Sequence, residues 1–290
     1  MAILINRDTQ VLVCAITGRS GQLQTKVMLD YGTKVVAGVT PGKGGQSVEG
    51  VPVYDFVSEA CAEHRIDAAI SFVPGAFSRD SCLEVFDAGI KFLVLTPEGI
   101  PDHDVVDIVN YARSKDARVL GPGTAGIIAP GKCKVGAHPA RMFKEGRAGV
   151  VSKSGALSYE VGKTLTEAGI GQSTVLAIGG GPVWGFTQRD AVELFQQDDE
   201  TGVIVLLGEI GGSMEEEAAD FISKHVTKPV VSLIVGRAAP AGKSLGHAGA
   251  IIEGSRGTAA SKIEALERAG VKTAKTPQEL AELIKQVRGC

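Results

Sequence analysis

A short apolar segment that runs directly into a glycine-containing turn and then into a helical segment recurs along this 290-residue chain. The first example is the apolar segment 11–16, followed by the turn Thr17-Gly18-Arg19-Ser20-Gly21-Gln22 and a helical pattern to about residue 30. Further apolar segments, with helical stretches between them, lie at 34–39, 68–72, 92–95 and 118–120. Buried strands that alternate with helices form parallel sheets with helices on both faces. The pattern therefore predicts an α/β fold with a doubly wound parallel sheet.

The first glycine turn is expected to bind phosphate, because the free amides and the dipole of a helix N-terminus both favour an anion. The second strand leads into the segment GVTPGKGG (38–45), where an NAD-binding sequence would carry an acidic residue. Lys43 lies there instead and suits an additional phosphate, such as the ribose 3′-phosphate of coenzyme A. A solvated turn lysine is the alternative. A P-loop is excluded, because Ala37 replaces its first glycine and Gly44 follows the lysine.

A second candidate binding segment, Thr96-Pro97-Glu98, directly follows the strand 92–95. Ligands of open α/β sheets bind at the carboxyl ends of the strands, so this position favours a ligand contact. Glu98 alone is weak support, because acidic residues are common near the start of a helix for electrostatic reasons.

The chain divides at a segment rich in glycine and proline, from residue 121 to residue 149. Such a composition is typical of a connection between domains. We therefore expect an N-terminal domain at 1–121, an inter-domain connection at 122–148 and a second α/β domain at 149–290. The second domain is expected to contain strands at 149–152, 175–178, 203–207 and 229–235, and helices at 154–168, 261–269 and 277–288.

Several residues of the second half fall just after its expected strands. Ser154 and Gly155 open a helix, Gly181 follows the strand 175–178, Glu209 lies in a glycine turn, and His247 lies in the segment SLGHAGA. The loops after parallel strands share one edge of the sheet, so these residues are expected to converge.

This set of residues has the parts needed for phosphoryl transfer. A neutral imidazole is a nucleophile, a carboxylate on its other nitrogen fixes the tautomer, and a helix N-terminus stabilises phosphoryl charge. A phospho-accepting His247 oriented by Glu209 is therefore predicted. The alternatives are a structural loop histidine and a Ser154 that only caps its helix.

Neither a metal site nor a disulfide framework is expected. The other histidines lie in helical or charged contexts that predict solvated side chains, and no pair of them has the spacing of a metal site (His64, His103, His138 and His225). The five cysteines are scattered, odd in number and without a CxxC pair. They indicate reduced thiols in a cytoplasmic or mitochondrial-matrix compartment.

The overall charge and the apolar pattern exclude other classes of partner. A net charge of −3 argues against nucleic acid, because binding a phosphate backbone requires a marked excess of Lys and Arg. No apolar run approaches the roughly 18 residues of a transmembrane helix, and the N-terminus lacks the pattern of a signal peptide. We therefore expect a soluble cytoplasmic protein, or a mitochondrial-matrix protein in a eukaryote, with no membrane contact.

Taken in order, these segments resemble the α-subunits of the succinyl-CoA synthetase family, which are nucleoside-diphosphate-forming carboxylic acid–CoA ligases, over essentially the whole chain. The most specific segments are GVTPGKGG (38–45), GEIGG (208–212) and GHAGAII (246–252). The resemblance implies a Rossmann-like CoA-binding domain followed by a flavodoxin-like ligase domain. It also implies a β-subunit partner whose nucleotide-grasp domain binds ATP or GTP with Mg²⁺, in a heterodimer or heterotetramer.

In this family a small carboxylic acid, CoA and ATP or GTP react in three steps. An acyl phosphate forms, the phosphoryl group exchanges with a histidine, and CoA attacks the acyl group. The resemblance implies that His247 is the phosphohistidine, that Glu209 orients it, and that Ser154 and Gly155 open the helix facing it. It implies that Tyr159 contacts the acid or the subunit boundary. The residues that match the family's CoA contacts are Thr17, Gly18, Arg19, Ser20, Lys43, Thr96, Pro97 and Glu98.

The chain departs from the family pattern in the segments around the acid. Gly123 and Thr124 stand where Asn and Cys are usual, and Gly181 replaces an Asp. Trp184 enters a segment of usually small residues, and Arg141 replaces a His. Gly123, Thr124 and Gly181 are therefore candidate acid-binding residues.

These changes remove a negative charge and add an aromatic wall and a cation. They predict an acid that is larger or more anionic than succinate, such as malate, citrate or a sulfonated acid like sulfoacetate. Succinate with drifted loops is the alternative. A non-catalytic, CoA-binding regulatory subunit is the competing functional class, and a nicotinamide oxidoreductase is disfavoured by the missing acidic residue after the second strand.

Overall fold

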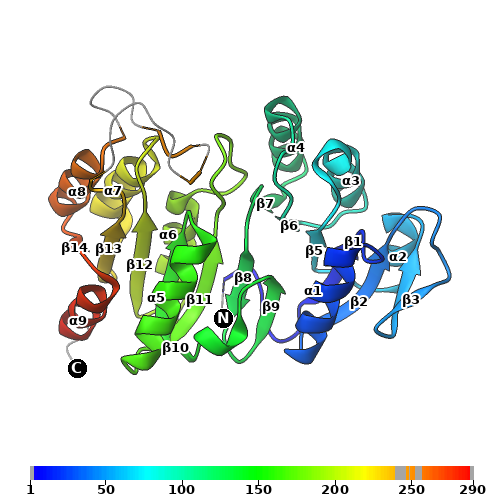
Figure 1. The fold of residues 1–290 in the computed structure, drawn as a ribbon, viewed down its shortest axis with the longest axis horizontal. Coiled ribbons are helices and arrows are strands. Elements are labelled where there is room, and N and C mark those ends of the chain that lie inside the picture. The colour runs from blue at the N-terminus through cyan, green and yellow to red at the C-terminus, as the bar shows by residue number, and fades with distance from the viewer. Residues whose placement is uncertain (1–2, 239–245, 248, 252–256, 288–290) are drawn as a thin grey trace.

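A computed structural model gives the fold and describes residues 3–238, 246–247, 249–251 and 257–287. Two seven-stranded sheets lie side by side, one in each half of the chain, and helices cover both of them (Figure 1). The predicted α/β class, with two successive sheets dominated by parallel strands, is confirmed.

The first half folds, in chain order, into β1 (Gln10–Cys14), α1 (Arg19–Asp30), β2 (Lys34–Val39), β3 (Ser47–Val48), β4 (Val51–Tyr54), α2 (Val57–Glu63), β5 (Ala68–Ser71), α3 (Gly75–Asp87), β6 (Phe92–Leu95), α4 (Asp102–Ser114) and β7 (Arg118–Leu120). The strand order in the sheet is β3-β4-β2-β1-β5-β6-β7. All neighbouring strands are parallel except β3, which pairs antiparallel with β4. The chain winds outward from β1 in both directions, as a doubly wound sheet does.

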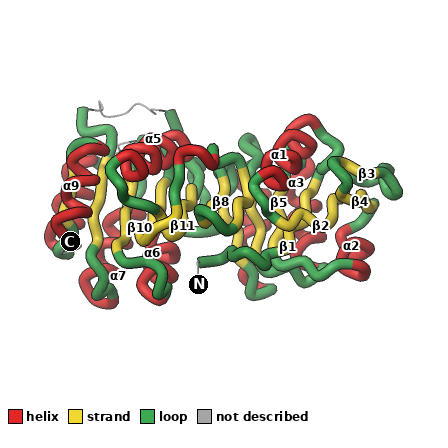
Figure 2. The backbone as a smooth tube through the Cα atoms, turned by 90° about the horizontal axis from the view of Figure 1, so that it is seen from below, coloured by secondary structure: helices red, strands yellow, loops and turns green. Residues whose placement is uncertain are grey.

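The central strand β1 is buried on both faces, as its unbroken apolar sequence predicts. Successive side chains of a strand point to opposite faces. Leu12 and Cys14 accordingly pack with residues of α2, α3 and α4, whereas Val11 and Val13 belong to the core on the α1 side. Figure 2 shows α1 and α2 on opposite sides of this sheet.

The second half folds into β8 (Gly126–Ala129), β9 (Cys133–Gly136), the 3₁₀ helix η1 (Ala140–Met142), β10 (Glu145–Ser152), α5 (Gly155–Glu167), β11 (Gln172–Ala177), α6 (Gln188–Gln197), β12 (Val203–Gly208), α7 (Met214–His225), β13 (Val230–Ile234), α8 (Ala259–Arg268), β14 (Lys272–Ala274) and α9 (Pro277–Val287). The strand order is β14-β13-β12-β10-β11-β8-β9. The first five of these strands are parallel to one another. Helices α5 and α9 cover one face of the sheet and α6 and α7 cover the other (Figure 2).

The segment predicted as an inter-domain connection, 122–148, contains β8, β9 and the start of β10. Strand β8 pairs antiparallel with β11, and β9 pairs antiparallel with β8, so most of the segment extends the second sheet. Ile127, Ile128 and Val135 are fully buried there. Pro130 and Gly131 of this segment lie in the turn of the hairpin, whereas Gly121, Pro122 and Gly123 precede β8. The domain boundaries themselves stay a prediction.

The hairpin also fastens the two halves to each other. The Thr33 hydroxyl, between α1 and β2, donates to the Lys134 carbonyl at 2.8 Å and accepts from the Lys134 amide at 3.0 Å. Ile127 and Val135 share one continuous core with Val11 and Val13 of the first sheet. Figure 1 shows β8 and β9 at the edge of the second sheet that faces the first half. The relative placement of the halves is therefore fixed by buried apolar contacts and by the hydrogen bonds of the Thr33 hydroxyl.

His138 is not solvated, contrary to the sequence-based expectation. Its side chain is fully buried between the rings of Phe143 and Tyr159, and Nδ1 lies 3.1 Å from the Ala125 carbonyl oxygen. Burial lowers the pKa of His138 to about 3, so the ring is neutral in the folded protein. The segment that follows β9 carries the ring under α5, which its local sequence does not indicate.

No helix in the described part of the chain is long and apolar enough to cross a membrane. Four cysteines there are free thiols, namely Cys14, Cys61, Cys82 and Cys133, and Cys290 lies outside the described residues.

Replacing Ile128 with Ala tests whether the hairpin contributes to the second core. The side chain is fully buried beside Val150 and Val175, so we expect a loss of about 2–5 kcal/mol of unfolding free energy in urea denaturation. The exposed Val106→Ala on α4 is the control and should change stability by less than about 0.5 kcal/mol. An unchanged urea midpoint for Ile128→Ala would show that the hairpin adds nothing to this core.

Replacing His138 with Gln should weaken the loss of stability in acid. The folded state holds this ring neutral, whereas the unfolded chain protonates it near its reference pKa of about 6.5. The unfolded state thus binds more protons as pH falls, and wild-type stability drops with it. Between pH 7 and pH 5 the wild type should lose about 2 kcal/mol more than the variant. Above pH 7 the two stability curves should run parallel, and equal slopes between pH 5 and 7 would contradict the assignment.

Candidate functional site

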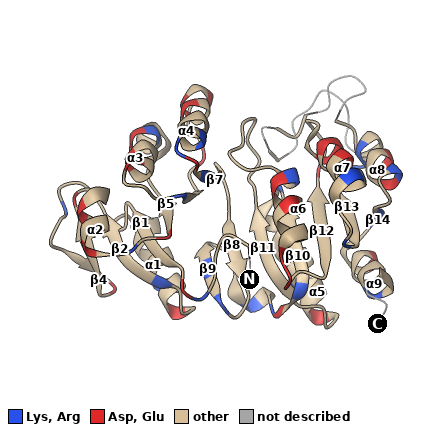
Figure 3. Cartoon of the chain, turned by 180° about the vertical axis from the view of Figure 1, so that it is seen from behind, with Lys and Arg blue, Asp and Glu red and all other residues tan. Residues whose placement is uncertain are grey.

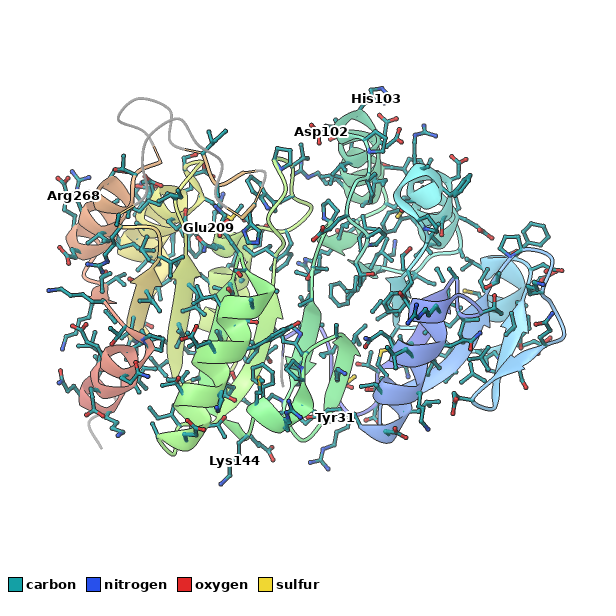
Figure 4. The ribbon with its side chains drawn as sticks, in the orientation of Figure 1. Tyr31, Asp102, His103, Lys144, Glu209 and Arg268 are labelled. Atoms are coloured by element: carbon teal, nitrogen blue, oxygen red, sulfur yellow. The ribbon has the colours of Figure 1, made fainter. Side chains whose placement is uncertain are left out.

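The candidate site lies at the carboxyl edge of the second sheet. Glu209 directly follows β12, Lys153 directly follows β10, and His247 lies in the segment between β13 and α8. Because β10, β12 and β13 are parallel neighbours, the segments that follow them meet at one edge. Figure 4 shows Glu209 at this edge and Asp102 facing the same side from the start of α4.

His247 and Glu209 form the central contact of the site. Nδ1 of His247 lies 2.8 Å from both carboxylate oxygens of Glu209. Glu209 is 7% exposed, and less than a third of the His247 side chain is exposed. A carboxylate at Nδ1 holds the proton on that nitrogen, so that the neutral ring carries its lone pair on Nε2. The pair therefore has the geometry of an oriented nucleophile.

The surroundings raise the pKa of His247 above its ordinary value. The hydrogen bond and the charge of Glu209 raise this pKa, and the Glu98 carboxylate adds to the effect. Partial burial and the Lys153 ammonium oppose them. The proton affinity of the ring is thus increased by the carboxylates of Glu209 and Glu98 and decreased by the ammonium group of Lys153.

Glycines allow the backbone to approach the imidazole closely. A methyl group at Gly180, three residues after β11, would lie 2.3 Å from Cγ of His247. The Gly249 amide donates to the Gly180 carbonyl at 3.1 Å and so ties the histidine segment to this glycine turn. Gly180 must therefore lack a side chain for the ring to occupy its position.

A chain of buried ion pairs extends behind Glu209. Lys153 Nζ lies 3.9 Å from Glu209 and 3.7 Å from Glu215, and Lys262 Nζ binds Glu215. Lys153, Glu215 and Lys262 are at most 1% exposed. The Glu209 amide also donates to Glu215 at 3.2 Å.

Sequence analysis did not identify Lys153, Glu215 or Lys262 as site residues. Lys153 directly precedes the helix start at Ser154, where a lysine is typical of an exposed turn. Glu215 stands among three consecutive glutamates at a helix start, which is typical of a solvated first turn. Its partner Lys262 is 47 residues away, on α8.

A pocket of about 310 Å³ opens at the boundary between the two halves and is lined in part by His247. The first half contributes Glu98, Asp102 and apolar side chains such as Ile100 and Val105. The second half contributes Gly180 and Gly181, and the connecting segment contributes Pro122 and Gly123. The predicted residues Pro97, Glu98, Gly123, Gly181 and His247 thus share one cavity.

The other predicted phosphate contacts lie along the carboxyl edge of the first sheet. Gly18, Arg19 and Ser20 are exposed at the start of α1, where no side chain caps the helix. The Thr17 amide donates to the Thr40 hydroxyl at 3.4 Å, which joins this turn to the segment after β2.

Lys43 is exposed in that segment, and its amide and that of Gly44 donate to Asp55 at 2.9 Å. Thr96 is turned inward, because its hydroxyl donates to the Ser71 carbonyl at 2.6 Å. Along the edge formed by β2, β1, β5 and β6, the Lys43 segment therefore comes first, then helix α1, and Glu98 comes last.

Of the residues expected around the acid, Gly123 and Gly181 line the pocket, and the others lie outside it. Ser154 caps α5, since its hydroxyl accepts from the Leu157 amide at 3.3 Å, and Gly155 packs against Ala125. The Thr124 hydroxyl binds the Ala177 carbonyl and the Gly126 amide, so it braces the backbone.

Three further side chains do not line the pocket either. Tyr159 is half-buried against His138, and Arg141 is exposed on η1. Trp184 packs over Lys153, with Nζ 5.5 Å from the ring centre, and donates from Nε1 to the Gly179 carbonyl at 3.0 Å.

Two protein-family models match the chain. The model described as a CoA binding domain matches residues 6–99, and the model described as CoA-ligase matches residues 151–272. The α-subunit 1 of an ADP-forming succinate–CoA ligase from Archaeoglobus fulgidus is 52% identical over 288 residues, covering 99% of this chain and 98% of the relative. The α-subunit from Aquifex aeolicus is 48% identical over 289 residues, covering 99% of this chain and 95% of the relative.

A solved structure shares the fold across both halves. The ATP citrate lyase from Methanothrix soehngenii, in complex with citrate and coenzyme A, matches with a TM-score of 0.91 and 23% identity. The match covers 99% of this chain and 51% of that one, so the present chain spans about half of that enzyme's length. At this identity the likeness shows the fold alone.

Replacing Glu209 with Gln should lower the pKa of His247. The substitution retains a hydrogen-bond acceptor but removes the negative charge that stabilises the protonated ring. An NMR titration of ring-labelled histidine would measure the shift. Glu217→Gln, an exposed carboxylate on α7, is the control and should leave the His247 titration unchanged. An unshifted His247 titration in Glu209→Gln would contradict the observed contact.

Proposed function

This chain belongs to the family of α-subunits of ADP-forming succinate–CoA ligases, and from that premise we propose that His247 is the phosphoryl carrier of a carboxylic acid–CoA ligase. The observation that carries the proposal is the contact of Nδ1 of His247 with both oxygens of Glu209 at 2.8 Å. It assigns the proton to Nδ1 and the nucleophilic lone pair to Nε2.

The phosphoryl group passes between Nε2 of His247 and the carboxylate of the acid. In one direction Nε2 forms a bond to phosphorus, and the P–O bond of the acyl phosphate breaks, with the electron pair leaving on the carboxylate oxygen. Throughout the transfer the proton on Nδ1 stays on the ring, where the Glu209 carboxylate stabilises the positive charge that develops. The reverse step makes the acyl phosphate. The thiol of bound CoA then attacks the carbonyl carbon of this acyl phosphate, the bond from that carbon to the phosphate oxygen breaks, and inorganic phosphate leaves with the electron pair.

The carboxyl edge of the first sheet fits an extended CoA. The uncapped start of α1 offers amides to phosphate, and a methyl group at Gly21 would lie 2.2 Å from the Ala15 carbonyl oxygen, so this tight turn requires glycine. Lys43 is exposed beside it for a further phosphate. From β2 to β6 the edge spans three strand spacings, or about 14 Å, and it ends at Glu98. The thiol end of CoA would therefore reach the His247 pocket.

The pocket itself suits the neutral arm of CoA better than an acid anion. Its walls include the apolar Ile100, Val105 and Val183, and its carboxylates, Glu98 and Asp102, would repel an anionic substrate. We therefore place the acid carboxylate on the side of Ser154 and Gly155, where the N-terminus of α5 favours negative charge.

Succinate is the first candidate acid, because the relatives with about half of their residues identical are named for it. A larger or more anionic acid, such as malate, citrate or sulfoacetate, is the second candidate. One observation favours it: Gly181, where family members usually carry Asp, lies beside His247 and lacks a side chain, so one carboxylate fewer faces an anionic acid that approaches the ring. Neither Trp184 nor Arg141 supports it, since their side chains lie elsewhere.

The nucleotide site belongs to the partner in this proposal. The named relatives are α-subunits, which implies a β-subunit. No group of three or more metal-binding side chains occurs among the residues that the structure describes. We infer that the β-subunit binds ATP or GTP with Mg²⁺ in its nucleotide-grasp domain, that the two chains form a heterodimer or heterotetramer, and that the complex works in the cytoplasm.

Phosphorylation of the complex tests the carrier. With the cognate β-subunit, Mg²⁺ and γ-³²P-labelled ATP or GTP, this chain should acquire a base-stable, acid-labile label. His247→Ala should lose the label completely, because the variant lacks the Nε2 atom that accepts the phosphoryl group. Glu209→Gln should slow labelling by about 100-fold or more, within the usual range for an essential positioned group. The exposed Glu217→Gln is the control and should label like the wild type.

Product analysis with CoA and a panel of acids then identifies the substrate. Succinyl-CoA as the dominant product would support the first candidate. Malyl-, citryl- or sulfoacetyl-CoA would support the second, and Gly181→Asp should then move the preference toward succinate. A label that survives in His247→Ala would contradict His247 as the carrier, and the absence of both label and acyl-CoA in the wild type would favour a regulatory CoA-binding subunit instead.

A further inference from the structure

Lys153 is a buried cation that forms an ion pair with Glu209. It stands at the end of β10, is 1% exposed, and its amide donates to the Leu207 carbonyl of β12 at 3.4 Å. This backbone contact aligns Lys153 with the start of the Glu209 turn, and Nζ lies 3.9 Å from Glu209 Oε1. Within the described residues, the ion-pair partners of Glu209 are His247 and Lys153.

The ammonium group of Lys153 is fixed from several directions. It lies 3.7 Å from Glu215, and it donates to the Gly211 carbonyl at 3.4 Å. Lys262, on α8, holds the other side of Glu215 and donates to the same carbonyl at 2.7 Å. Glu215 is on α7 and Lys262 is on α8, and Figure 3 shows these two helices lying side by side. The position of Lys153 is therefore set by the fold.

Trp184 covers Lys153 on the side of the histidine segment. Its ring centre lies 5.5 Å from Lys153 Nζ, and its Cζ2 lies 3.4 Å from the place of a methyl group at Gly249. The hydrogen bond from Nε1 to the Gly179 carbonyl fixes the ring there. A covered ion pair is screened less by water than an exposed one, so the charge of Lys153 acts strongly on Glu209.

We propose that Lys153 is a positioning residue, which balances the charge of Glu209 so that Glu209 orients His247 without holding it in the protonated form. This rests on the proposed role of His247 as phosphoryl carrier. Two lysines and two glutamates alternate behind the ring as Glu209, Lys153, Glu215 and Lys262, and together they carry no net charge. Without Lys153, an uncompensated carboxylate would face the imidazole, and the protonated ring cannot attack phosphorus.

The charged groups around the ring set the direction of the expected effect. Glu209 after β12, Glu98 after β6 and Asp102 at the start of α4 are negative, and Glu215 lies behind Lys153. Lys153 and, farther away, Lys262 are the opposing cations. Loss of Lys153 leaves the carboxylates in excess, so protonated His247 is stabilised and the phosphorylation rate needs a higher pH.

The test measures the pH profile of single-turnover His247 phosphorylation in the complex with the β-subunit. In Lys153→Met the acid limb of the profile should move to higher pH by about one unit, which gives about tenfold less rate on the acid side and near-wild-type rate at the alkaline plateau. Lys153→Gln keeps a donor for the Gly211 carbonyl and should shift in the same way. Lys153→Arg should restore the wild-type profile.

Lys134→Gln is the matched control, because Lys134 is equally buried but lies in the hairpin, away from Glu209. Its profile should keep the wild-type acid limb. A lower plateau with an unmoved acid limb in both Lys153→Met and Lys153→Gln would overturn the proposal and leave Lys153 a packing role. If wild-type His247 takes no label, the proposed function fails first, and the variants are not needed to decide it.

Discussion

A buried carboxylate in contact with an imidazole is the interaction on which the rest of the site depends. Glu209 is almost fully buried, so its charge requires partners, and the fold supplies them from the segments after β10 and β13. Isolated buried charges are expensive, and the chain of ion pairs to Lys262 is the structural consequence of placing one carboxylate beside His247. The second sheet thus does more than present loops, because its central strands align Lys153 with Glu209 and fix the distance between them.

The pocket beside His247 exists only because two separate sheets are held together. Its acidic and apolar walls come from the first half, and the histidine and the glycine turn come from the second. The hairpin β8–β9 holds these parts in register, through a core shared with β1 and through the two hydrogen bonds of Thr33. A flexible linker could not supply this placement. The segment 122–148, predicted as an inter-domain connection, therefore holds the two halves together through its hairpin.

Local patterns predicted what depends on neighbours in the sequence. The bounds of β2, β6 and β7 agree with the predicted apolar segments, and the glycine turn before α1, the Glu209 turn and the exposed Lys43 lie where their patterns indicated. Features set by distant partners were missed or misread. The composition of 122–148 did not indicate the hairpin β8–β9, His138 was predicted to be solvated but is buried, and Lys153 and Lys262 form ion pairs with carboxylates on other elements. Whether a polar group is buried depends on which elements of the chain pack over it, and the hydrophobic periodicity of the sequence does not indicate those contacts.

The contact between Gly180 and the imidazole restricts which amino acids can occupy position 180, but it does not restrict the next position. Any side chain at position 180 would displace the ring from Glu209, since even a methyl group would overlap it. Position 181, one residue further, lines the pocket, and a methyl group there would make only an ordinary contact, 3.7 Å from the Val183 carbonyl oxygen. Substitutions at 181 can therefore change the pocket wall without disturbing the contact of His247 with Glu209, whereas position 180 admits glycine alone, so two adjacent codons are under different constraints.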